Sequence, residues 1–173
     1  MNISIERIKH QECQEIVSWN YPEDYQWTAL GQGSENEAYL LSAKHREDHY
    51  YAIHDDEELA GYFSVNDRIR KEIGALQLVI RPDLCTEENE RKILKAVEQN
   101  VQKRYENCLY LNAVCYDYQT HAMAVYEACG YENRGPVRSQ GHDMQTYEQE
   151  GFDTSGNVIR RQITLYILSK KIK

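Results

Sequence analysis

Alternation of apolar and polar residues predicts three β-strands in the N-terminal half of the chain. Ile3 and Ile5 alternate with polar residues as a first strand, and the runs 50–54 and 59–65 are rich in apolar and aromatic residues. The acidic segment 55–58 separates the two runs, so they are predicted to form a β-hairpin with a solvated turn.

Helical spacing is found on both sides of a proline break. Apolar residues repeat every three to four positions over about 11–19, which predicts an amphipathic helix. Tyr21 and Pro22 then mark a break in a mixed, aromatic segment. Two more helices are expected after it, a short one at about 23–27 and another near 35–43.

The middle of the chain predicts a strand, a long helix and a second strand. The apolar run 73–80 ends at Arg81 and Pro82, and the helix that follows, about 87–105, carries an apolar face. The second strand is about 109–114. Because such a crossover connects parallel strands, 73–80 and 109–114 are predicted to be parallel neighbours. The residues of that apolar face are Ile93, Leu94, Val97, Val101 and Tyr105.

The C-terminal part predicts one more helix and a hairpin. The helix is expected over about 120–129 and stops at Gly130, a residue suited to a left-handed cap. A short strand near Tyr131 and a hairpin around 153–157 follow, and the second arm of that hairpin alternates apolar residues through Ile167. Together these elements predict a mixed α/β fold in one domain, residues 1–173.

Composition and charge narrow the possible functions. A chain of 173 residues, with 41% hydrophobic and 28% charged residues, is typical of one globular domain with a full core. The net charge of -8 leaves no basic stripe for a phosphate backbone, so nucleic-acid binding is disfavoured and a cationic small substrate is favoured.

The N-terminal sequence, the cysteines and the histidines argue against a secreted protein, a disulfide framework and a metal site. The N-terminus has no signal-peptide pattern and no apolar run reaches membrane-spanning length, so a cytoplasmic protein without a membrane partner is expected. The five cysteines form no C-x-x-C pair and are expected to be free thiols, with Cys13 and Cys129 on apolar helix faces. The six histidines lack metal-ligand spacing, so no metal site is predicted.

The segment 76–131 resembles the GNAT superfamily of acyl-CoA-dependent N-acetyltransferases. The segment 119–131 is similar to the family signature of Asn, two residues, Ala, three residues, Tyr-Glu, two residues, Gly and an aromatic, with Gln119 in the place of the Asn. The resemblance implies the GNAT fold, a central, mostly antiparallel sheet with one parallel, splayed strand pair flanked by helices.

The resemblance assigns a catalytic role to Tyr126. It implies that the tyrosine points at the sulfur of acetyl-CoA and protonates the departing thiolate as general acid. Without the resemblance, the helical face that Tyr126 shares with its apolar neighbours favours a core aromatic whose hydroxyl finds a partner. Gln119 is expected to hydrogen-bond the coenzyme.

The pyrophosphate loop of the family is degenerate in this chain. The matching run is 85–90, where Glu88 and Glu90 occupy the positions of the usual glycines, and no glycine lies between Gly74 and Gly130. Glycines matter there because main-chain N–H groups at a helix N-terminus must approach the phosphates. The alternative is an ordinary helix start, capped by Thr86 and with acids that satisfy the helix dipole.

The remaining coenzyme contacts are also implied by the resemblance. The expected binding residues are the strand end Leu78, Val79 and Ile80, together with Thr86, Arg91 and Gln119, and the amides of Val79 and Ile80 are expected to polarise the thioester carbonyl. No general base is singled out, and the candidates are Glu72, Gln77, His54, Glu35 and Glu23.

Two functions follow from these residues. The first is an N-acetyltransferase that moves an acetyl group from acetyl-CoA to a primary amine of a small molecule or peptide. The second is a non-catalytic GNAT-fold module that binds a ligand or protein and has lost tight coenzyme binding. The acids at Glu88 and Glu90 favour the second, whereas Tyr126, Gly130 and Arg91 favour the first. A monomer and a homodimer are both left open.

Overall fold

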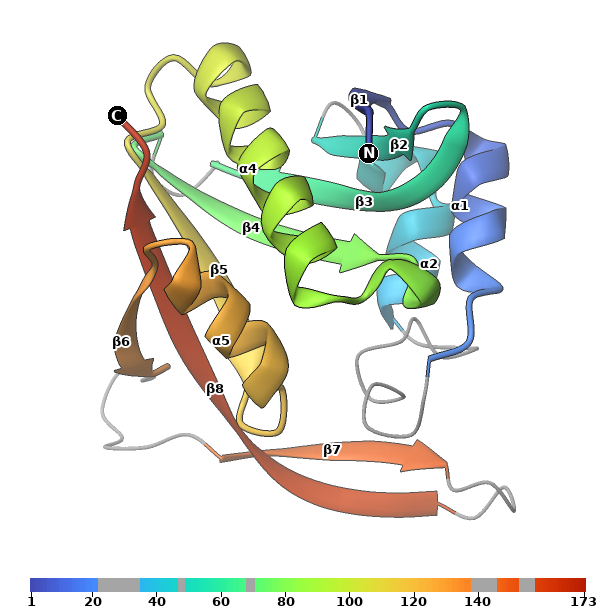
Figure 1. The fold of residues 1–173 in the computed structure, drawn as a ribbon. Helices are drawn as coiled ribbons and strands as arrows, with labels where there is room; N and C mark the ends of the chain where they lie inside the picture. The colour runs from blue at the N-terminus through green and yellow to red at the C-terminus, as the bar shows by residue number, and fades with distance from the viewer. Residues whose placement is uncertain (22–34, 47–48, 68–70, 138–145, 153–157) are drawn as a thin grey trace.

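The computed structural model describes residues 1–21, 35–46, 49–67, 71–137, 146–152 and 158–173. A single sheet runs through the molecule, and its strands follow the order β1-β2-β3-β4-β5-β8-β6, with β7 paired to β8 (Figure 1). The strands are β1 Ile3–Arg7, β2 Tyr50–Asp55, β3 Glu58–Asn66, β4 Ile73–Ile80, β5 Tyr110–Tyr116, β6 Glu132–Pro136, β7 Thr146–Phe152 and β8 Val158–Lys171.

Helices cover both faces of the sheet. They are α1 His10–Val17, α2 Glu35–Leu41, α3 Ala43–Arg46, α4 Glu87–Arg104 and α5 Thr120–Ala128, with a short 3₁₀ helix at Pro82–Leu84. None of the helices in the described part of the chain has the length and apolarity of a membrane span.

The parallel pair predicted from the sequence is confirmed. Strands β4 and β5 are parallel from Ile73 opposite Tyr110 to Leu76 opposite Ala113, and α4 connects them. Every other strand pair in the sheet is antiparallel. The fold is therefore the predicted mixed α+β type, mostly antiparallel with one parallel pair.

The parallel pairing ends before either strand does. β4 continues from Leu76 to Ile80 beside β3, and β5 continues from Ala113 to Tyr116 beside β8. Each strand thus follows its antiparallel partner past the last parallel contact. The two strands separate at their C-terminal ends, which leaves a gap in the sheet (Figure 1).

Two clusters of buried hydrophobic side chains lie on the two faces of the sheet, one on each. The larger cluster joins the sheet to α4 through Ile93, Leu94, Val97 and Val101, and α5 packs against its edge. The smaller cluster joins the sheet to α1 and α2 on the opposite face. Side chains on β2 alternate between the two clusters, as a strand covered on both sides requires. The smaller cluster contains Cys13, Ile16, Leu40, Ala52, Leu59 and Tyr62.

Several boundaries differ from the sequence prediction. The helix expected near 35–43 is two helices, because the chain leaves helical geometry at Ser42. The helix expected at 23–27 and the hairpin loop 153–157 lie outside the described residues, although the arms β7 and β8 are paired as predicted. Gly130 has φ of 88°, which confirms its left-handed cap.

The cysteines are free thiols, as expected, and burial raises the pKa of all five. Cys115, on β5, is 2% exposed, and burial raises the pKa of its thiol from 9.0 to about 12. The unfolded chain therefore releases this proton at a lower pH than the folded chain does. The stabilisation is complete below pH 9 and is lost between pH 9 and about 12.

We therefore expect the free energy of unfolding to fall as the pH rises above about 9. Cys115 alone should contribute a loss of up to about 1.4 kcal/mol per pH unit. Urea unfolding under reducing conditions at pH 8 and pH 10 measures this loss. The same comparison on Cys115→Ala should give a smaller drop, and equal drops in both proteins would contradict the assignment.

Candidate active site

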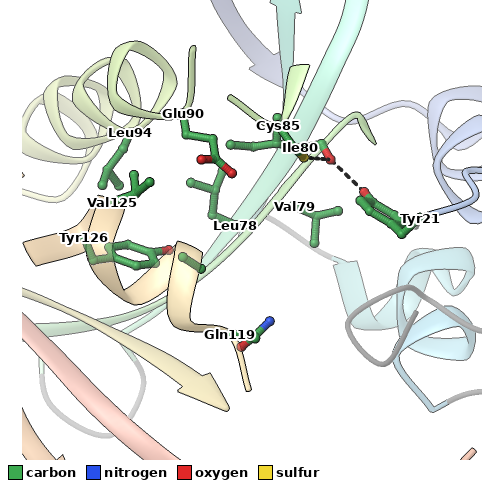
Figure 2. A pocket seen from close by; sticks show the side chains of 11 residues that line it. Tyr21, Leu78, Val79, Ile80, Cys85, Glu90, Leu94, Gln119, Val125 and Tyr126 are labelled. Atoms are coloured by element: carbon green, nitrogen blue, oxygen red, sulfur yellow. Dashed lines mark hydrogen bonds between the residues drawn. The ribbon is translucent and has the colours of Figure 1, made fainter. Parts of the chain in front are cut away.

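A pocket opens where β4 and β5 separate. Its empty volume, including the part open to solvent, is about 630 Å³, and its walls come from the end of β4, the start of α4, the start and one face of α5, and Tyr21 (Figure 2). This size suits a small ligand or one arm of a larger one. The lining residues are Tyr21, Leu78, Val79, Ile80, Cys85, Glu90, Leu94, Gln119, Ala122, Val125 and Tyr126.

The main-chain N–H and C=O groups of successive β4 residues point alternately toward β3 and toward the pocket. The Arg81 amide donates to the Ala60 carbonyl at 2.8 Å, which makes Arg81 and Ala60 a hydrogen-bonded pair. Ile80 is opposite Gly61, the next pair along the ladder, and in an antiparallel ladder that residue turns its N–H and C=O away from the partner strand. The Ile80 carbonyl points away from β3, since it accepts a hydrogen bond from the Tyr21 hydroxyl at 2.7 Å.

The same alternation changes one expectation from the sequence. Val79 faces β3 with its main-chain groups, and its carbonyl oxygen lies 2.4 Å from where a Cβ on Gly61 would stand. The amides directed toward the gap are then those of Leu78 and Ile80. Leu78 replaces Val79 as a candidate to polarise a carbonyl, while the Val79 side chain lines the pocket.

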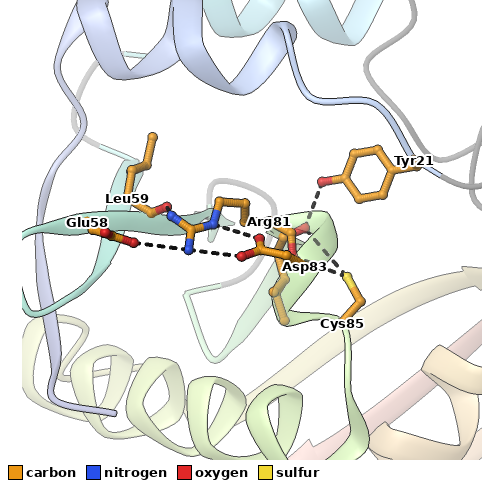
Figure 3. Close-up of polar contacts among 7 residues, drawn as sticks. Tyr21, Glu58, Leu59, Arg81, Asp83 and Cys85 are labelled. Carbon is orange, nitrogen blue, oxygen red and sulfur yellow. Dashed lines mark hydrogen bonds and ion pairs between the residues drawn. The ribbon is translucent and has the colours of Figure 1, made fainter.

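Arg81 fixes the end of β4 to its neighbours. Its guanidinium donates to the Asp83 carboxylate at 2.7 and 3.1 Å and to the Leu59 carbonyl at 3.0 Å, and it pairs with Glu58 at 3.3 Å (Figure 3). These bonds tie the 3₁₀ turn after β4 to the start of β3. The Arg-Pro-Asp-Leu sequence therefore holds the pocket wall in place.

Tyr126 lies on α5 with its ring against the core and its hydroxyl directed into the pocket (Figure 2). The ring packs edge to face on Tyr131, with centroids 5.0 Å apart. Burial, followed by nearby groups including Cys115 and Glu90, raises the pKa of Tyr126. The hydroxyl therefore stays protonated at neutral pH, and burial makes it a weaker acid than an exposed tyrosine. The residue is therefore a core aromatic whose hydroxyl lines the pocket, and its catalytic role stays a prediction.

Gln119 is the N-cap residue of α5 and also lines the pocket. Its Oε1 accepts from the Tyr116 amide at 2.8 Å, which closes the turn after β5. The carbonyl side of the amide is therefore engaged in the turn. Its NH₂ group is the donor that a ligand in the pocket can meet.

Thr86 and Arg91 are outside the pocket lining. The Thr86 hydroxyl accepts from the Asn89 amide at 3.4 Å and caps α4, as the sequence alternative predicted. Arg91 pairs with Glu87 at 3.2 Å and donates to the Ala128 carbonyl at 3.3 Å, at the end of α5. The pocket thus brings together five of the seven predicted residues, and these two support the helices around it.

The acids that open α4 point in different directions. Glu88 is 78% exposed and pairs with Lys92 at 2.6 Å on the helix surface. Glu90 is 11% exposed, lines the pocket and contacts His121 Nε2 at 2.5 Å through Oε2. Of these acids, only Glu90 therefore faces the pocket. Burial and then the Glu90 carboxylate raise the pKa of the Cys85 thiol, which also lines the pocket, to about 12.

The described candidates for a general base lie away from this pocket. His54 bonds Glu12 at 2.8 Å, Gln77 accepts from Ser64 at 3.4 Å, and Glu72 is exposed, and none of the three lines the pocket. Glu23 and the side chain of Glu35 lie outside the described residues.

Comparison with known proteins decides the family. Residues 5–153 match the model of the acetyltransferase (GNAT) domain. The chain belongs to this family. No curated protein sequence matches it.

Solved structures of GNAT acetyltransferases share the fold. Spermidine N-acetyltransferase from Vibrio cholerae, solved with CoA and spermine, aligns over 98% of this chain and 95% of its own, with a TM-score of 0.70 and 14% identity. A GNAT acetyltransferase from Bacillus anthracis aligns over 99% and 96%, with a TM-score of 0.68 and 11% identity. YncA from Salmonella typhimurium, solved with its cofactor acetyl-CoA, aligns over 100% of this chain and 95% of its own, with a TM-score of 0.63 and 11% identity.

Gly61 offers a test of how β3 supports the pocket. In Gly61→Ala the new Cβ would meet the Val79 carbonyl oxygen at 2.4 Å, so β4 must shift beside the pocket. In the control Gly74→Ala the new Cβ would meet side chains of Val65 and Leu111 at 2.8 and 3.1 Å, at the paired end of β4. Both variants should lose about 1–3 kcal/mol of stability.

Only Gly61→Ala should loosen the pocket wall. Hydrogen exchange should become faster at Val79 and Arg81, whose amides bond to β3, in this variant and stay closer to wild type there in Gly74→Ala. Unchanged stability in Gly61→Ala, or equal exchange at these two amides in both variants, would contradict the packing described here.

Proposed function

We propose that this GNAT protein transfers an acetyl group from acetyl-CoA to a primary amine of a small molecule or peptide. The observation that carries the proposal is the convergence of a proton donor and main-chain amides on one pocket. The hydroxyl of Tyr126 comes from α5, and the amides of Leu78 and Ile80 come from the unpaired end of β4. A proton donor and carbonyl-polarising amides in one pocket suit acyl transfer.

The acyl end of the coenzyme fits the residues that are present. Leu78, Val79, Leu94 and Ala122 give apolar walls for a thioester and its pantetheine arm. Acetyl-CoA supplies an activated acyl carbon and a thiolate leaving group. The amides of Leu78 and Ile80 stabilise the negative charge that develops on the carbonyl oxygen, as preformed dipoles do in acyl-transfer sites.

Tyr126 supports departure of the leaving group. Its protonated hydroxyl donates to the sulfur as negative charge develops there. The attacking amine loses its proton to water, which is the route open when none of the described candidate bases lines the pocket. Gln119 presents its NH₂ group to the bound ligand, the contact expected of it.

The phosphate end fits less well. Glu90 presents a carboxylate in the wall beside α4, where the family binds the pyrophosphate. Charges about 4 Å apart interact by roughly 4 kcal/mol at an effective dielectric of about 20. This acid favours the second candidate function, a non-catalytic binding module. Thr86 and Arg91, the other two expected coenzyme contacts, lie outside the pocket lining and bond to residues of α4 and α5.

The acceptor is inferred from charge. A net charge of -8 favours a cationic acceptor. A structural neighbour of 14% identity is a spermidine N-acetyltransferase, which supports an amine as the acceptor class. We therefore propose small polyamines and peptide amines as the first acceptors to test. A single domain over residues 1–173 and a cytoplasmic location stay predictions, and a monomer and a homodimer both stay open.

Two measurements separate the candidate functions. Calorimetric titration with acetyl-CoA measures donor binding, and release of free thiol in the presence of spermidine or a lysine-containing peptide measures transfer. Binding with amine-dependent thiol release supports the enzyme. Binding without release for any amine, or no binding, would instead support the non-catalytic module.

Tyr126→Phe is expected to lower kcat by about 10²–10⁴ fold, the scale of one general acid. Tyr131→Phe is the matched control, because its buried hydroxyl lies outside the pocket lining and its ring packs on Tyr126. The control should keep kcat near wild type. Both variants should bind acetyl-CoA with wild-type affinity, and unchanged turnover in Tyr126→Phe would remove the residue from the mechanism.

A further inference from the structure

The contact between Glu90 and His121 joins the two helices that border the pocket. Glu90 lies in the first turn of α4, and His121 is the second residue of α5. Their side chains meet at 2.5 Å, Glu90 Oε2 to His121 Nε2, and Glu90 is buried while His121 is 40% exposed. A carboxylate accepts hydrogen bonds, so His121 is the donor in this pair.

The position of the Glu90 carboxylate is one that suits an anion. The first turn of a helix carries a partial positive charge, and the imidazole donor of His121 stands opposite Glu90. The neighbouring acids Glu87 and Glu88 make i,i+4 pairs with Arg91 and Lys92 on the surface instead. Of the three acids in this turn, Glu90 is the one that lines the pocket.

We propose that Glu90 and His121 form an exchangeable anion site that selects the acyl donor. This inference rests on the proposed function. In the free protein the Glu90 carboxylate satisfies the His121 donor. When a phosphorylated donor binds, Glu90 must leave, and His121 then donates to a phosphate oxygen. Glu90 therefore stands in for a ligand phosphate and competes with it.

The competition has a consequence for specificity. A donor with a pyrophosphate must displace a charged group and is bound more weakly than in the absence of Glu90. A donor without phosphate, such as acetylpantetheine, leaves the Glu90–His121 contact in place. The pair therefore reduces the preference of the pocket for the full coenzyme over its phosphate-free arm.

The test is calorimetric titration of acetyl-CoA and acetylpantetheine with four proteins. These are wild type, Glu90→Gln, the surface control Glu88→Gln, and the double variant Glu90→Gln with His121→Ala. Glu90→Gln keeps the shape of the side chain and removes its charge. We expect it to bind acetyl-CoA roughly 10- to 1,000-fold more tightly, with acetylpantetheine unchanged. Glu88→Gln should match wild type for both ligands.

The double variant tests the role of His121. It should lose most of the gain of Glu90→Gln for acetyl-CoA, because the phosphate then lacks its donor, and should bind acetylpantetheine as wild type does. Thermal unfolding of each variant confirms that it is folded. Acetyl-CoA binding that is unchanged or weaker in Glu90→Gln would overturn the proposal, as would an equal gain for both ligands.

The outcomes also separate this inference from the proposed function. Wild type that transfers acetyl groups, with no gain in Glu90→Gln, keeps the function and rejects the anion site. Wild type that neither binds acetyl-CoA nor transfers, with tight binding in Glu90→Gln, supports the anion site and rejects the enzyme. Absence of acetyl-CoA binding in wild type and in Glu90→Gln rejects both.

Discussion

The separation of β4 from β5 is the constraint on which the site depends. Each strand is held along its length by an antiparallel partner, β4 by β3 and β5 by β8, while their contact with each other ends at Leu76 and Ala113. Because antiparallel pairing is slightly more stable than parallel pairing and sheets twist, the two strands follow their own partners apart. The unpaired amides of Leu78 and Ile80 and the hydroxyl of Tyr126 meet in the gap that this leaves.

An open gap in a sheet is costly unless side chains fill it or satisfy it. The ring of Tyr126 packs on the hydrophobic core beside the gap, and the contact between Glu90 and His121 connects the starts of α4 and α5. A carboxylate in the first turn of a helix stabilises that helix by about 0.3–1 kcal/mol. The same charge opposes a phosphate in the same space. On the proposed function, the Glu90 carboxylate would therefore raise the stability of the fold and lower the affinity for a phosphate, a common trade-off at functional sites.

Patterns within short segments of the sequence were enough to predict the fold and part of the site. The crossover, the α5 signature and the Gly130 cap depend on nearby residues, and the structure confirms them. The different roles of Glu88 and Glu90 had a signal in the spacing, because Glu90 shares the apolar face of Leu94 and Val97 and Glu88 does not. The contact with His121 depends on how two helices pack, and the amide directions on β4 depend on the β3 register. Neither can be read from one segment.

In the proposed transfer reaction, the two ends of the pocket would affect different kinetic constants. In the proposed reaction, the amides of Leu78 and Ile80 and the hydroxyl of Tyr126 would interact most strongly with charge that exists only in the transition state, and would therefore govern kcat. A phosphate is equally charged in the ground state and in the transition state, so the proposed repulsion by Glu90 would change the binding of both alike and would appear in KM. A chain with a weakened phosphate site can therefore keep its chemistry intact. The acid in the loop argues for a modified donor preference, and by itself it is no argument against catalysis.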